Sequence, residues 1–139
     1  MNNLRINHLA VWVSIVLMHA LGFLWYGVLF AEQWMAMVGM DEATMQEDSG
    51  SMGVWIMNSV AIIASAYFLA WLLAKLGVTG IRAAATGFIV AFVVHHLNLM
   101  NTNMFAGEPY GLAWITGGYV IASFTIAGFI IGSWVKKGD

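Results

Sequence analysis

Histidine and asparagine side chains gather in one apolar stretch of this sequence, where they could bind a metal ion or a polar ligand. The stretch runs from residue 81 to 105, and its second half reads His95-His96-Leu97-Asn98-Leu99-Met100-Asn101. Residues 83–107 include no Asp, Glu, Lys or Arg, so the stretch is long and apolar enough to cross a bilayer. A polar group in hydrocarbon costs several kcal/mol unless it finds a partner. We therefore expect these side chains to form a site or to bond to neighbouring helices.

Two polar stripes diverge on this segment if it is one regular helix. At 100° per residue, the first stripe joins His95 to Asn98, Asn101 and Thr102, whereas His96 lies about 100° away. Adjacent histidines on such a helix are too divergent to bind one metal ion. We expect His95 to contribute more to a site than His96, because it shares its stripe with the carboxamides.

Other segments carry polar residues that could complete the site. His19 and Tyr26 share one face of the first apolar segment, Asn58 lies in the outer third of the second, and Tyr119 lies in the last. These groups fall mostly in the outer half of the bilayer, where they could line a narrow pocket. The predicted ligand-binding residues are His19, Tyr26, Asn58, His95, Asn98, Asn101 and Tyr119.

Two arrangements could hold a transition metal or haem. His19 and His95 could supply ligands from two helices. Met35, Met37 and Met40 form an M-x-M-x-x-M pattern, and thioethers suit Cu(I). The alternative for the methionines is an interfacial segment that rests at the lipid headgroups.

The elements that must position these residues are membrane helices. The chain has 139 residues, of which 61% are hydrophobic and 9% charged, and its mean hydropathy is +0.82. Four long segments lack charge, and none alternates as a barrel strand does. The sequence predicts an all-α, integral membrane four-helix bundle in one domain, 1–139, with spans of about 6–30, 53–75, 82–105 and 110–135. The chain has no cysteine, which excludes disulfides and thiolate sites.

Charge asymmetry predicts the orientation of the bundle. All the basic residues fall on one side of the expected membrane: Arg5, Lys75, Arg82, Lys136 and Lys137. Six of the seven acidic residues fall on the other. The positive-inside rule then places both termini in the cytoplasm, N-in and C-in. We expect the first span to be retained, because it is long for a signal peptide and no A-x-A site follows it.

Small residues predict close helix contacts. Gly128 and Gly132 form a G-x-x-x-G pair, which brings helix backbones together either within the chain or across a symmetry axis. Because small-residue ladders recur on three of the expected spans, we expect a homo-oligomer.

Several motifs together resemble a known family. They are Gly22-Phe23-Leu24-Trp25-Tyr26 with Phe30 and Trp34, Asn101-x-x-x-Phe105-x-Gly107-x-Pro109, Gly118-Tyr119, and Gly128-x-x-x-Gly132-x-Trp134. The chain resembles, over nearly its whole length, the small bacterial membrane proteins catalogued as domain of unknown function 1761. The resemblance implies four spans in a bacterial inner (plasma) membrane and no settled activity. The His95-His96 pair is not part of that pattern.

Three classes of function remain open on the sequence. The first is binding or transport of a small ligand, such as a solute, a metal ion, haem or a quinone. The second is a structural or accessory subunit of a homo-oligomer or larger membrane complex, in which the polar stripes bond helices together. An enzyme has the least support, because no carboxylate lies in any span and no Ser-His-Asp or H-E-x-x-H pattern occurs. The expected partners are the lipid bilayer and other membrane proteins, and no nucleic acid. The two divergent stripes favour the first class.

Overall fold

Four long apolar helices make up most of the protein, as the sequence predicts. The computed structural model describes residues 4–137, with the backbone alone at 45, 48, 49 and 137. The helices long and apolar enough to span a membrane are His8–Leu29, Met52–Leu76, Gly80–Ala106 and Tyr110–Ser133. Helices suit such segments because each backbone N–H and C=O is paired within the span, where lipid offers no partner. The all-α membrane fold is confirmed.

The spans consist of several elements in chain order. They are α1 (His8–Leu24), η1 (Trp25–Leu29), α4 (Met52–Leu76), α5 (Gly80–Val90), η2 (Ala91–His96), α6 (Leu97–Ala106) and α7 (Tyr110–Ser133). Two short helices, α2 (Ala31–Val38) and α3 (Glu42–Ser49), connect the first span to the second. The elements η1 and η2 are single π-helical turns that interrupt the first and third spans.

Glycines end three of the helices, because the chain must reverse there. Gly39, Gly77 and Gly107 follow α2, α4 and α6 with φ angles of 71°, 66° and 72°. Only glycine adopts this left-handed conformation at no steric cost. The single proline, Pro109, precedes α7, where its missing N–H leaves no helical bond unmade.

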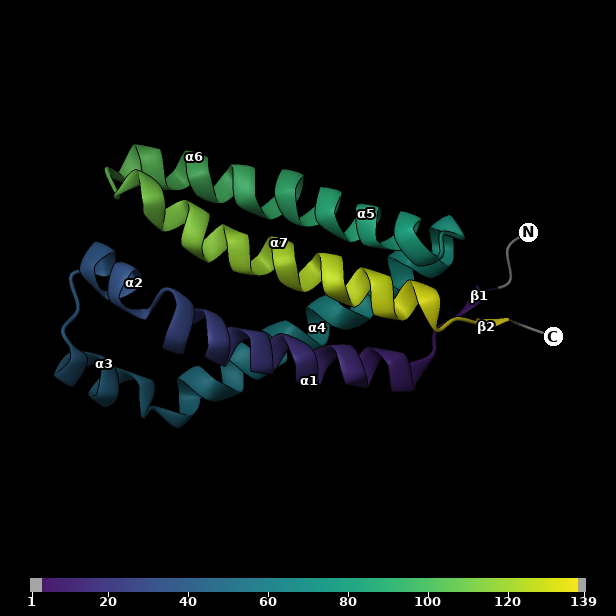
Figure 1. Ribbon diagram of the computed structural model, residues 1–139, viewed down its shortest axis with the longest axis horizontal. Helices are drawn as coiled ribbons and strands as arrows, with labels where there is room; N and C mark the ends of the chain where they lie inside the picture. The colour runs from purple at the N-terminus through teal and green to yellow at the C-terminus, as the bar shows by residue number, and fades with distance from the viewer. Residues whose placement is uncertain (1–3, 138–139) are drawn as a thin grey trace.

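Helix α7 lies in the middle of the bundle, with α1 on one side and α5–α6 on the other (Figure 1). The most extensive contact between helices is that of α5 with α7. A Cβ atom on Gly128 would lie 2.6 Å from the Ala83 carbonyl oxygen, and one on Gly132 would overlap the Ala83 methyl group. The G-x-x-x-G pair is therefore used within the chain, in the contact of α7 with α5.

The apolar core lies in the half of the bundle nearest the termini. It includes Val11 and Ile15 of α1, Leu69 and Leu73 of α4, and Ile131 of α7. At the other end, residues 52–58 of α4 are all exposed. Helix α4 crosses behind α1 and α7, so only part of its length packs against them (Figure 1).

The two ends of the chain meet at one end of the bundle, as four spans require (Figure 1). Strand β1 (Leu4–Arg5) pairs antiparallel with β2 (Lys136–Lys137). The Asn7 side chain accepts a hydrogen bond from the Leu9 N–H (3.2 Å), which caps α1, and donates one to the Trp134 carbonyl (2.8 Å). This pairing of the two chain ends is not predicted from the sequence, because a two-residue strand has no periodic pattern.

Candidate functional site

The π-helical turn η2 sets the directions of the two polar stripes on the third span. On a regular helix, Ala91 and His96 would point 140° apart. In a π-helical turn, where hydrogen bonds join residues i and i+5, residues five apart lie on the same face of the helix. Both residues are buried, and His96 packs against α7. The π-helical turn has one residue more than an α-helical turn. This shift places His96 against α7 and leaves His95 on the outside.

His96 is enclosed between its own helix and α7. Its ring is 0% exposed. It stacks on Phe92, with 5.5 Å between ring centroids, and lies 4.4 Å from the Trp114 ring. Gly117 makes the room, since a Cβ atom there would fall on the imidazole, 3.0 Å from its Cγ. Neither ring nitrogen has a hydrogen-bond partner among residues 4–137.

The other stripe faces away from the bundle. His95, Asn98, Asn101 and Thr102 are all exposed, and we call these four side chains the polar face. Asn98 donates from Nδ2 to the Val94 carbonyl (2.8 Å), and the Thr102 hydroxyl donates to the Asn98 carbonyl (3.0 Å). These bonds stay within the helix, so one N–H and the oxygen of the Asn98 carboxamide remain available to a partner. The structure thus encloses His96 and leaves His95 on the outer surface, although the sequence led us to expect the larger contribution to a site from His95.

His19 joins α1 to α4. Its Nδ1 lies 2.9 Å from the Ile15 carbonyl oxygen and its Nε2 lies 3.3 Å from the Ser59 hydroxyl. Because a carbonyl only accepts, Nδ1 carries the proton and Nε2 accepts from Ser59. Both nitrogens are therefore engaged, and the ring lies on a different helix from His95.

Tyr26 and Tyr119 are brought together, in an aromatic contact between the first and last spans. Their ring centroids are 5.6 Å apart. The Tyr119 hydroxyl donates to the Met18 carbonyl and the Trp25 indole to the Ile115 carbonyl, both at 2.9 Å. Each bond links the first span to α7. The cluster therefore holds helices together.

Asn58 and the three methionines have no hydrogen bond to these groups among the described residues. Asn58 is exposed on α4. Met35 and Met37 are two residues apart on α2, so their side chains point about 200° apart, and Met40 follows the turn at Gly39. The Met37 thioether lies against α7 at Gly111. The Cu(I) arrangement of the three methionines therefore stays a prediction.

The histidines present do not fit a haem or transition-metal centre. No group of three or more His, Cys, Asp or Glu side chains converges among the described residues. The two histidines expected to act as ligands are separated, since His19 is bonded to Ser59 and His95 lies on the polar face. His96 could supply one nitrogen, but the space around its ring is filled by Phe92 and α7.

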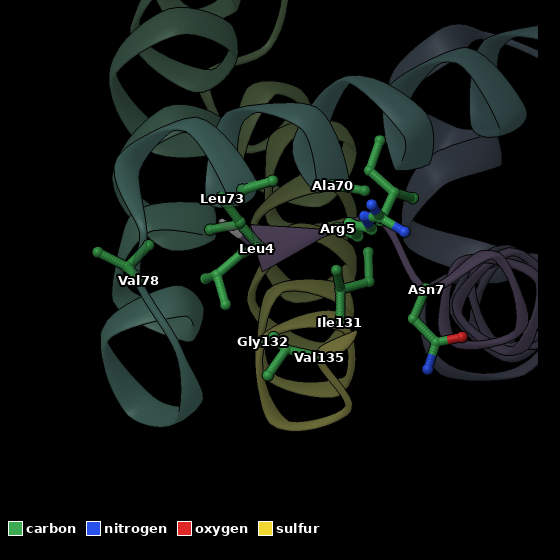
Figure 2. Close-up of a pocket in the computed structure, with 11 residues that line it drawn as sticks. Leu4, Arg5, Asn7, Ala70, Leu73, Val78, Ile131, Gly132 and Val135 are labelled. Carbon is green, nitrogen blue, oxygen red and sulfur yellow. The ribbon is translucent and has the colours of Figure 1, made fainter. Parts of the chain in front are cut away.

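A pocket occurs at the opposite end of the bundle, beside the termini (Figure 2). Leu4 of β1, Leu73 of α4 and Ile131 of α7 line it together with Arg5. Its volume is about 10 Å³, roughly the space that one water molecule needs. The pocket is therefore too small for an organic ligand. None of the four residues of the polar face lines it.

Comparisons with known proteins identify a family but no activity. No curated protein and no solved structure matches the chain significantly. A family model described as "Protein of unknown function (DUF1761)" matches residues 9–132, which span the four helices and every candidate residue named above. The chain therefore belongs to the DUF1761 family of proteins of unknown function.

Proposed function

We propose that this protein is a structural or accessory subunit of a membrane assembly, in which the polar face binds another transmembrane helix. The observation that carries the proposal is the exposure of His95, Asn98 and Asn101 on the outside of a segment that can span a membrane. Polar side chains in spans normally face a bundle interior or a cavity, because lipid cannot hydrogen-bond them. A partner helix would supply those bonds.

The packing of the other polar residues supports this function over a ligand site within one chain. His19, Trp25 and Tyr119 each use a polar atom to bond one span to another. Such bonds contribute about 0.6 kcal/mol each on average in membrane proteins and account for these residues without a ligand. The pocket beside the termini is too small for a solute.

Binding or transport of a small ligand remains a second candidate, supported by His96. Its two nitrogens are buried with no hydrogen-bond partner in the part of the chain that the structure describes, and each such group costs about 1–3 kcal/mol. A ligand would have to separate η2 from α7 to reach the 0% exposed ring. An absorption spectrum and elemental analysis of protein purified in mild detergent would reveal a bound chromophore or metal ion.

Native mass spectrometry of protein extracted with its surrounding lipid tests the proposed function. We expect particles heavier than the 15.2 kDa chain, containing further copies or another membrane protein. Replacing both His95 and Asn98 with leucine should shift the particles to single chains, because leucine suits lipid. Asn58→Leu is the matched control, since Asn58 is an exposed carboxamide on a different helix. Single chains from the wild type would refute the proposal.

We also propose a bacterial inner-membrane location with both termini in the cytoplasm. Support comes from the basic residues, all of which lie near the termini or the α4–α5 turn. Ser51→Cys and Thr79→Cys place single thiols at opposite ends of α4 in a cysteine-free chain. An impermeant maleimide added to whole cells should label Ser51→Cys alone. Labelling of Thr79→Cys alone would mean the inverse orientation.

A further inference from the structure

We propose that the partner of the polar face is a second copy of this chain, related by a two-fold axis along the membrane normal, with the two Asn98 side chains facing each other. This inference rests on the proposed function and names the partner. The interface would be a parallel pair of α6 helices.

Spacing along α6 favours a helix pair. His95, Asn98, Thr102 and Phe105 follow one another at intervals of three, four and three residues, and all are exposed. This is the a/d spacing by which two parallel helices pack along a seam. Phe105, 88% exposed, lies at the end of the seam and would add apolar area there.

Depth in the membrane favours a second copy over an unrelated helix. A partner must offer hydrogen-bonding groups at the levels of His95, Asn98 and Thr102. Copies inserted in the same orientation carry the same residues at the same depth. The two-fold axis then makes the interface isologous, so each polar group meets its equivalent.

The chemistry of Asn98 is self-complementary. Its carboxamide has two N–H donors and an oxygen acceptor, and the bond to the Val94 carbonyl uses one donor. Across a two-fold axis, the remaining N–H of each copy can donate to the Oδ1 of the other, which gives two equivalent hydrogen bonds. A single buried asparagine is known to fix the register and number of strands in paired helices.

Contacts within the chain leave this face available. The glycine pair of α7, which could otherwise form a dimer contact, packs against Ala83 of α5. Helix α6 packs against α7 through the side that follows His96, and the polar face lies on the opposite side. The two copies can therefore meet without disturbing the bundle.

Cysteine crosslinking in isolated membranes tests the pairing. Phe105→Cys and Met104→Cys place single thiols at the same depth on adjacent exposed positions, 88% and 66% exposed. They point about 100° apart, and only Phe105 lies on the seam. We expect mild oxidation to link Phe105→Cys into a dimer of two 15.2 kDa chains and to leave Met104→Cys mostly monomeric.

A second variant tests the role of Asn98. In the Phe105→Cys background, Asn98→Leu should lower the dimer association constant, measured from the crosslinked fraction over a range of protein-to-lipid ratios, about eightfold, because two membrane hydrogen bonds of the usual strength are lost. Asn58→Leu in the same background should leave it unchanged. Equal crosslinking of Met104→Cys and Phe105→Cys, or no effect of Asn98→Leu, would overturn the inference.

The outcomes separate this inference from the proposed function. Particles that contain a different membrane protein and a single copy of this chain would refute the two-fold pair and leave the assembly function standing. Particles with one chain and no partner would refute both. Dimers that crosslink at Phe105 and lose that link in Asn98→Leu support both.

Discussion

Replacing Gly87 with alanine tests the closest helix contact in the bundle. Gly87 is buried in α5, and a Cβ atom there would overlap the carbonyl oxygen of Phe124 in α7 and lie 2.9 Å from its carbon. Both are backbone atoms, so no side-chain rotation can relieve the contact. Helices α5 and α7 would have to separate, and the packing of Ala83 against Gly128 and Gly132 would loosen with them.

The expected loss of stability follows from two opposing effects. Overpacking a tight interior contact costs about 1–3 kcal/mol. Alanine recovers up to about 1 kcal/mol, because it is the better helix former. Gly87→Ala should therefore lower the free energy of unfolding by about 1–2 kcal/mol. Gly128→Ala should act similarly, because its Cβ would lie 2.6 Å from the Ala83 oxygen, about 0.8 Å short of an ordinary 3.4 Å contact.

Reversible unfolding in mixed detergent micelles, followed by tryptophan fluorescence, measures this effect. Gly27→Ala is the matched control, since, apart from the neighbouring backbone of its own helix, no described atom lies within 4 Å of the Cβ position at that glycine. It should be neutral or slightly stabilising. If Gly87→Ala were as stable as Gly27→Ala, the backbone contact between α5 and α7 would not exist as described, and the central position of α7 would be in doubt.

Three further predictions concern single polar groups. Ser59→Ala should cost about 0.6–1.7 kcal/mol of stability, because the hydroxyl bonds to His19; no loss would exclude that bond. His96→Leu should raise stability by about 1 kcal/mol or more, since each of the two nitrogens without a partner among residues 4–137 costs about 1–3 kcal/mol and each of the two lost ring contacts contributes about 0.5–1.5 kcal/mol; a lower melting temperature would contradict this. The Thr44 hydroxyl and N–H donate to Asp41 and hold the pKa of that carboxyl below its usual 3.8, so the cap stabilises α3 at neutral pH and is lost only as pH falls through the lowered pKa. NMR chemical shifts of α3 measure this, and loosening between pH 7 and about 5 would exclude the carboxylate cap.

The number and nature of the spans follow from sequence alone. Four uncharged segments of sufficient length must be helices in lipid, because a lone segment can pair its backbone groups only as a helix. Capping residues such as Gly77, Gly107 and Pro109 mark where those helices end or begin. The family resemblance is also carried by local motifs, and the match over residues 9–132 confirms it.

The sequence also identifies the residues that matter for packing without giving their partners. Gly128 and Gly132 predict a close contact, but the spacing is the same whether the neighbour is α5 or another chain. His19 predicts a bond to another span, and only the tertiary structure supplies Ser59 as that partner. The periodicity of a sequence shows which residues share a face of one helix. It does not show which other helix packs against that face.

The directions of the polar stripes are decided only by the tertiary structure. A π-helical turn has one more residue per hydrogen-bonded turn than an α-helix. It needs no particular amino acids, so residues 91–96 give no sign of it in the sequence. The turn decides which of the two adjacent histidines is buried. His96 is enclosed against Gly117, and His95 faces outward on the same side as Asn98. The sequence thus determined that polar groups lie within the third span. Which of them the bundle encloses depends on packing against α7, because the His96 ring occupies the space that Gly117 of α7 leaves.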